Sequence, residues 1–223
     1  MNADFWLDRW RTNQTGWHAA ETNKHLVSRL PLLGDSNGRW TLVPLCGKSV
    51  DMEYLATQGR KVLGIDLSAI ACRAFLEASG RAYSHHEVGG MVHFESTDIK
   101  LICGDLFAIE PEELPPIASC YDRACLIALT PEQRRLYARW LARAMPEGAV
   151  SLLIAVEYPP AEKSGPPHSV PTDEVYALFE PYFSIELLER TDVLGDSPKY
   201  REWGVTSLHE TVYALRRNEE GGQ

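Results

Sequence analysis

Apolar strand-like segments alternate with helix-like segments along most of this chain, and this alternation constrains its fold more than any other feature. Buried strands that alternate with helices favour a mostly parallel sheet with helices on both faces, which is a doubly wound α/β fold. The last two strands have no long helix between them, which favours an antiparallel edge. The seven predicted strands are residues 40–45, 61–66, 99–103, 119–126, 149–156, 183–190 and 207–215.

Turn and capping residues separate these strands. The turn Cys46-Gly-Lys-Ser49 precedes a predicted helix from Val50 to about Gln58, and Ser68 can cap the helix after the second strand. The pair Gly89-Gly90 indicates a small inserted hairpin. Residues 159–171 are rich in Pro, Gly and Ser, and their length predicts a lid or a substrate loop rather than a simple connector.

The length of 223 residues fits one α/β domain better than two. Hydrophobic residues make up 44% of the chain, which is enough for a sizeable core. We therefore expect a soluble protein with a single domain that has three parts. These parts are an N-terminal helical lid segment over 1–35, an α/β core over 36–217 and a frayed polar tail over 218–223.

Charge and cysteine content narrow the classes of function. The formal net charge of −9 disfavours a broad nucleic-acid surface. The chain has five cysteines, an odd number, and no C-x-x-C pair. We therefore expect free thiols in a reducing compartment, the cytoplasm. No run of 18 apolar residues predicts a membrane span, and no secretory signal begins the chain. These features favour a cytoplasmic monomer that acts on small molecules and has no nucleic-acid or membrane partner.

The predicted sheet also locates the candidate ligand site. In doubly wound sheets, ligands bind outside the carboxyl ends of the strands. Among the seven histidines there is no HExxH motif and no compact Cys/His cluster, so no metal site is expected, and no G-x-S-x-G nucleophile is present. The turns at the carboxyl ends are Leu45–Ser49, Asp66–Ser68, Gly104–Phe107 and Asp122–Cys125.

The first two turns together favour an adenosine ligand. Gly47 lets the backbone turn sharply in front of a helix whose first N–H groups suit an anion. A phosphate-binding P-loop would need a further glycine where Leu42 stands, which disfavours that alternative. Asp66 lies 19 residues after Gly47, where an acid can accept hydrogen bonds from both ribose hydroxyls.

The remaining candidates leave more than one interpretation open. Asp105-Leu106 can offer an acceptor and an apolar wall to an adenine ring. Arg123 either pairs with Asp122 or reaches the ligand. The tryptophans Trp6, Trp10 and Trp17 either dock the first helix on the core or face a cationic ligand such as a sulfonium.

At this point the motifs resemble those of the thiopurine S-methyltransferase family in its bacterial form, over about residues 5 to 215. The Pro-Leu-Cys-Gly-Lys-Ser-x-Asp-Met string is the most specific of them, because this family uses it in place of a glycine-rich loop. The matching motifs are Arg9-Trp10, Gly16-Trp17-His18, Val43-Pro-Leu-Cys-Gly-Lys-Ser-Val-Asp-Met52, Gly64-Ile-Asp-Leu-Ser68, Cys103-Gly-Asp-Leu-Phe107 and Asp122-Arg123.

The resemblance implies a class I, Rossmann-like methyltransferase that uses S-adenosylmethionine. It implies that Trp17 covers the methyl donor and borders the acceptor pocket, that Lys199 contacts the acceptor, and that Arg123 stabilises a thiolate without any covalent enzyme intermediate. Arg201 is the alternative to Lys199. The family usually has Glu where Asp66 stands. The residues implied to line the donor site are Trp10, Leu45, Asp66, Asp105, Leu106 and Arg123.

The acceptor implied by the resemblance is the thiol or thiolate of a thiopurine or a similar aromatic thiol. An alternative within the family is a selenium or tellurium species, whose methylation would be a detoxification. An alternative from another class is a nucleotide-binding module without catalysis, and a P-loop hydrolase is a third.

Overall fold

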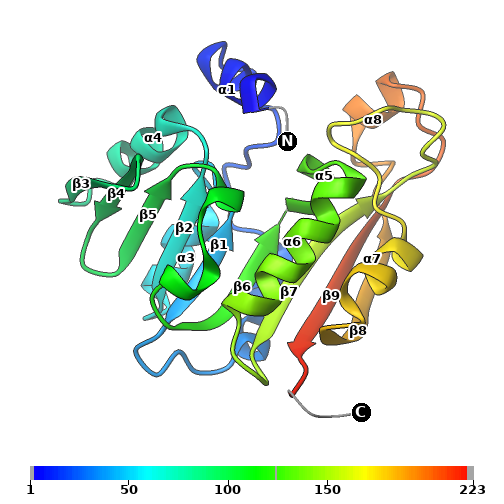
Figure 1. Cartoon of the computed structure of the whole chain (residues 1–223). Helices are drawn as coiled ribbons and strands as arrows, with labels where there is room; N and C mark the ends of the chain where they lie inside the picture. The colour runs from blue at the N-terminus through cyan, green and yellow to red at the C-terminus, as the bar shows by residue number, and fades with distance from the viewer. Residues whose placement is uncertain (1–2, 124, 220–223) are drawn as a thin grey trace. The chain divides into compact units, whose positions relative to one another are not determined.

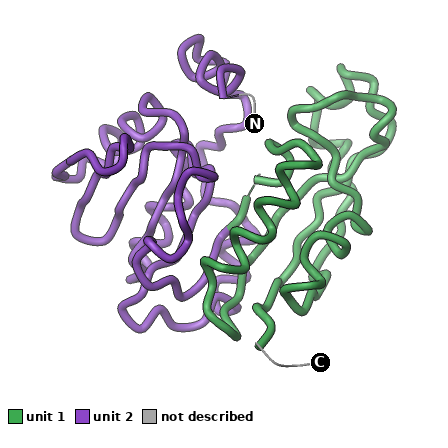
Figure 2. The backbone as a smooth tube through the Cα atoms, in the orientation of Figure 1, with its two compact units in different colours: residues 1, 122–223 green, residues 2–121 purple. Residues whose placement is uncertain are grey.

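The computed structural model describes residues 3–123 and 125–219. The chain divides into two compact units, residues 2–121 and residues 122–223, which are coloured separately in Figure 2. Each unit is described by itself below. The sequence predicted one domain with a lid, a core and a tail, and that division stays a prediction.

The unit of residues 2–121 contains the predicted parallel part of the sheet (Figure 1). Its strands lie in the order β3-β4-β5-β2-β1-β6. The strands β5, β2, β1 and β6 pair parallel with one another, whereas β4 pairs antiparallel with both β3 and β5. The strands are β1 (Trp40–Pro44), β2 (Lys61–Asp66), β3 (Ser84–Val88), β4 (Met91–Glu95), β5 (Ile99–Cys103) and β6 (Ile117–Arg123). The helices are α1 (Ala3–Arg11), α2 (Lys24–Arg29), α3 (Val50–Thr57) and α4 (Ala69–Ser79), with short 3-10 helices at Leu30–Leu33, Leu106–Ala108 and Pro111–Glu113.

Local signals placed these elements correctly. All five residues of β1 are buried, as expected for a strand covered on both faces. The Ser49 side chain accepts a hydrogen bond from the Asp51 N–H and caps α3, and Ser68 accepts one from Ala71 and caps α4. The predicted hairpin is β3 and β4, which pair antiparallel and add two strands to the seven that were predicted.

The unit of residues 122–223 has an antiparallel sheet in the order β7-β9-β8, which confirms the predicted edge. A capping box formed by Thr130 and Gln133, with Pro131 at the first position, begins helix α6. The elements are α5 (Cys125–Ala128), α6 (Pro131–Ala144), β7 (Val150–Glu157), α7 (Thr172–Phe179), β8 (Phe183–Asp192), α8 (Pro198–Glu202) and β9 (His209–Arg217).

One predicted strand boundary is wrong, for a local reason. The strand predicted over 119–126 ends at Arg123, and Cys125 begins a helix, because the Asp122 carboxylate accepts a hydrogen bond from the Cys125 N–H at 3.2 Å and turns the chain. The frayed tail predicted over 218–223 stays a prediction. Asn218 donates its N–H to the Tyr182 carbonyl at 2.9 Å, and residues 220–223 lie outside the described residues.

Replacing Gly64 by alanine should destabilise the fold by about 1–3 kcal/mol, the usual cost of overpacking a core. A Cβ atom at this position on β2 would lie 2.7 Å from Leu101 Cδ2, 2.8 Å from Cys46 Sγ and 2.9 Å from Met52 Sδ. Urea unfolding measures the effect. Gly195→Ala is the matched control, since a Cβ there meets nothing within 4 Å, and an equal loss in both variants would contradict the packing argument.

Candidate functional site

The loop between β1 and α3 has a backbone that only a few residue types adopt easily. Leu45 has φ 47° and Gly47 has φ 53°, so both lie in the left-handed region. The loop is attached to β2, because the Cys46 N–H donates to the Ile65 carbonyl at 3.0 Å. A strained non-glycine residue held in this way is typical of a functional loop.

Asp66 joins this loop to the end of β2. Its Oδ2 atom accepts a hydrogen bond from the Gly47 N–H at 2.8 Å, and its Oδ1 atom accepts one from the Ser68 N–H at 2.8 Å. A carboxylate has about four lone-pair positions, so each oxygen can accept one more hydrogen bond. This geometry disfavours a P-loop, because the Gly47 N–H faces a carboxylate instead of a phosphate and the carboxylate would repel that phosphate.

The Asp66 side chain is buried, with 8% of its surface exposed. Burial raises the pKa of its carboxyl from 3.8 to about 6, against the opposing effect of the hydrogen bonds from Ser68 and Gly47. The group is therefore mostly ionised at pH 7 and titrates just below that pH. Neighbouring hydroxyl donors would favour its ionised form.

The affinity for a ligand that donates hydroxyl groups to Asp66 should fall as the pH drops from 7 to 5. With a pKa of about 6 the ionised fraction falls about tenfold over this range, and the ligand binds the ionised form more tightly. Calorimetry with S-adenosylhomocysteine should show a loss of up to about tenfold. Asp66→Asn should flatten the profile, and a variant that keeps the full wild-type slope would assign the titration to another group.

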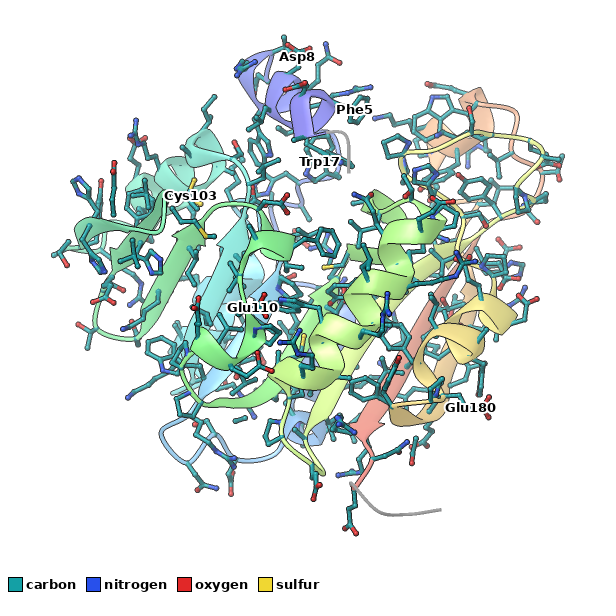
Figure 3. The ribbon with its side chains drawn as sticks, viewed as in Figure 1. Phe5, Asp8, Trp17, Cys103, Glu110 and Glu180 are labelled. Carbon is teal, nitrogen blue, oxygen red and sulfur yellow. The ribbon has the colours of Figure 1, made fainter. Side chains whose placement is uncertain are left out.

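Helix α1 presents aromatic side chains to the same loop. Figure 1 shows α1 beyond the carboxyl ends of the parallel strands of its unit, and Figure 3 shows Trp17 beside this helix. A Cβ atom on Gly47 would lie 3.2 Å from Trp10 Cζ2, so the Trp10 ring packs directly on the loop. Trp17 meets the rings of Trp10 and Trp6 edge-on at centroid distances of 5.9 and 5.3 Å.

The three tryptophans differ in burial, and the difference decides which of them docks α1 on the core. The sequence left Trp6, Trp10 and Trp17 as candidates for this contact. The structure gives that contact to Trp10, the buried residue of α1, whereas Trp6 is only partly buried. Trp17 is 41% exposed, so part of its side chain remains accessible to a ligand.

The turn after β5 has the polar and apolar residues that were predicted there. Asp105 is exposed, and its carboxylate accepts a hydrogen bond from the Phe107 N–H at 3.0 Å, which caps a short 3-10 helix. Leu106 is buried in the same turn, with 2% of its surface exposed. This turn lies beside Asp66, since Asp66 and Cys103 are partners in the pairing of β2 with β5.

Asp122 in the second unit is a structural carboxylate. It accepts a hydrogen bond from the Tyr137 hydroxyl at 2.5 Å in addition to the one from Cys125, and burial raises its pKa to about 6. These contacts explain Asp122 without a ligand. Arg123 follows it at the end of β6 and is less buried.

Lys199 lies on α8, where its Nζ atom is 5.2 Å from the centre of the Trp203 ring. Lys163, from the loop over 159–171, lies over the same ring at 4.5 Å, and the sequence analysis missed it. Arg201 donates to the carbonyls of Leu194 and Gly195. Because Arg201 is held by the backbone, Lys199 is the better candidate for a substrate contact.

No group of three or more His, Cys, Asp and Glu side chains within residues 3–123 and 125–219 could hold a metal ion. None of the helices found in this part of the chain is both long and apolar enough to cross a membrane.

Comparisons with known proteins find one family and one fold. The family model for thiopurine S-methyltransferase matches residues 1–218. The thiopurine S-methyltransferase of Pseudomonas aeruginosa strain UCBPP-PA14 is 43% identical over 217 residues, which are 97% of this chain and 100% of the relative. The enzyme of the same name from Xanthomonas axonopodis pv. citri strain 306 is 41% identical over the same shares of the two chains.

Solved structures with low sequence identity share the fold. A structure that describes conversion of a disulfide bond into a thioacetal group during echinomycin biosynthesis has a TM-score of 0.71 at 16% identity and covers 100% of this chain and 95% of its own. The N-methyltransferase NodS from Bradyrhizobium japonicum WM9, in complex with S-adenosylhomocysteine, has a TM-score of 0.66 at 15% identity. The match covers 98% of this chain and 100% of NodS. The fold is therefore the class I, Rossmann-like methyltransferase fold.

Proposed function

Because this chain belongs to the thiopurine S-methyltransferase family, we propose that it transfers the methyl group of S-adenosylmethionine to the sulfur of a small aromatic or heterocyclic thiol, such as a thiopurine. It is an S-adenosylmethionine-dependent methyltransferase by family and fold. The observation that carries the proposal is the buried Asp66 carboxylate, hydrogen-bonded to the Gly47 loop beneath the Trp10 ring. We place the enzyme in the cytoplasm as a monomer without nucleic-acid or membrane partners.

The residues around this loop fit the methyl donor. Asp66 retains an acceptor position on each oxygen, as two ribose hydroxyls require. The turn with Asp105 and Leu106 has a carboxylate and an apolar side chain for the amino group and ring of adenine. Trp10, Leu45 and Arg123 complete the donor site in this proposal.

The donor supplies an electrophilic methyl group on a positively charged sulfur when it is bound. The protein's residues then have to align the acceptor sulfur with that methyl group, because an in-line displacement needs no covalent enzyme intermediate. Trp17 can cover the site and exclude water, and its aromatic face suits a cation. Arg123 and Lys199 can favour the thiolate form of the acceptor, since a nearby positive charge lowers the pKa of a thiol.

Removing the ammonium group of Lys199 should impair the acceptor and spare the donor. We expect Lys199→Ala to lower kcat/KM for the thiol by about tenfold, the scale of one contact to a charged group, while S-adenosylhomocysteine affinity stays unchanged. Steady-state kinetics and calorimetry measure the two effects. Arg201→Ala is the matched control on the same helix, and a fall in donor affinity for Lys199→Ala would assign this lysine to the other substrate.

A methyl-transfer panel with isotope-labelled donor tests the proposed function. We expect label on the sulfur of 6-mercaptopurine and thiophenol, and none on hypoxanthine or phenol, which have oxygen in its place. Label on selenite or tellurite alone would replace the thiol by a metalloid acceptor. Binding of the donor without transfer to any acceptor would favour a non-catalytic nucleotide-binding module.

A further inference from the structure

A cavity of about 470 Å³ lies between helices α3 and α4, next to the loop that carries Gly47. Lys48 lines it from that loop, and His18 lines it from the segment that follows Trp17. All of these residues belong to the unit of residues 2–121. A volume of this size lies in the range of small-molecule sites, which is roughly 300–1,000 Å³.

The wall of the cavity is mostly apolar. Val50 of α3 and Ala74, Phe75 and Ala78 of α4 line it, and Phe75 is only 4% exposed. The two alanines have small side chains, so the α4 wall leaves room between the two helices. Such a space suits a planar aromatic group, which gains free energy by leaving water.

Among the polar groups of the cavity, the positive charge of Lys48 is not balanced by a negative one. Lys48 is half-buried as a residue, and within residues 3–123 and 125–219 neither its ammonium nor the Tyr54 hydroxyl makes an ion pair or a hydrogen bond. Glu53 also lines the cavity, but Arg81 binds both of its oxygens, at 2.7 and 2.9 Å. An ammonium without an ion pair, beside a carboxylate that Arg81 neutralises, favours an anion.

We propose that this cavity is a second small-molecule site, which binds an aromatic monocarboxylate. The ring packs between Val50 of α3 and the apolar side chains of α4, and the carboxylate accepts hydrogen bonds from the Lys48 ammonium and the Tyr54 hydroxyl. His18 and Thr22 line the rim, so the bound anion also contacts the N-terminal segment between Trp17 and Asn23. That segment is fixed at its far end, where the Asn23 N–H donates to Asp51 Oδ1 at 2.8 Å.

Calorimetry of the full-length protein with 1-naphthoate tests the site, with saturating S-adenosylhomocysteine present to occupy the donor site. We expect binding that weakens about 10- to 100-fold in Lys48→Met, the scale of a lost hydrogen bond to a charged group. The neutral analogue 1-naphthylmethanol should bind both proteins equally and weakly. Lys61→Met, which removes a lysine remote from the cavity, should retain the wild-type affinity.

Filling the cavity separates this site from any other that holds an aromatic ring. Ala78 is exposed on α4, so Ala78→Trp should fold and abolish 1-naphthoate binding while S-adenosylhomocysteine affinity is retained. Glu77→Trp adds the same bulk at the neighbouring exposed position and should bind normally. Unchanged 1-naphthoate affinity in either Lys48→Met or Ala78→Trp would overturn the proposal.

Discussion

Asp66→Ala should weaken the binding of S-adenosylhomocysteine by about 1.5–3 kcal/mol, which is about 10- to 150-fold in the dissociation constant. The carboxylate accepts hydrogen bonds from the Gly47 and Ser68 N–H groups and has one acceptor position left on each oxygen. Its removal therefore takes away the ribose acceptors and releases the loop that approaches the ligand. Calorimetry at pH 7.5, where the wild-type group is ionised, measures the loss.

Two matched variants show whether the effect belongs to Asp66 itself. Asp66→Asn keeps one carbonyl acceptor and the approximate shape, so it should lose less affinity than alanine does. Asp105→Ala removes an exposed carboxylate from the neighbouring turn and should cost less still. Unchanged affinity in a folded Asp66→Ala protein would remove this residue from the donor site.

Deleting residues 1–18 should leave a folded protein that binds S-adenosylhomocysteine at least about 100-fold more weakly and transfers no methyl group. The deletion removes Trp10, whose ring packs on Gly47, and Trp17, which meets Trp10 edge-on. We expect this segment to act as a lid that the donor orders and that excludes water from the reacting sulfur.

Hydrogen exchange distinguishes a lid from a permanently docked helix. Amide exchange across residues 5–25 should slow when S-adenosylhomocysteine binds. Trp10→Ala should reproduce most of the deletion, whereas Phe5→Ala, which removes a ring that meets Trp6, should have a small effect. Slow exchange without ligand, unchanged by its addition, would make the segment a structural part of the fold.

Local signals made much of the fold predictable. Ser49 and Ser68 begin α3 and α4 as expected, because a helix cap depends on residues within one turn of the chain. Asp66 was located at the end of β2 for a similar reason, since burial and strand length are readable from neighbouring residues.

Contacts between distant residues were not predictable in the same way. The packing of Trp10 on Gly47 joins positions 37 residues apart, and no periodicity within α1 distinguishes Trp10 from Trp6. The helix at Cys125 depends on which side chain caps it, and an apolar run alone resembles a strand. Lys163 and Lys199 share the Trp203 ring only because a long loop returns to α8.

The raised pKa of Asp66 links the stability of the protein to the supply of its methyl donor. Above pH 6 this buried carboxyl is ionised in the folded chain, and its ionisation lowers the free energy of unfolding by about 3 kcal/mol. Below pH 3.8 the carboxyl is protonated in both the folded and the unfolded chain, so this penalty is absent. A donor at 100 times its dissociation constant would return about 2.7 kcal/mol. The abundance of the folded enzyme in a cell should therefore follow the concentration of S-adenosylmethionine. In a cell starved of the donor, more of the enzyme should be unfolded and degraded by proteases.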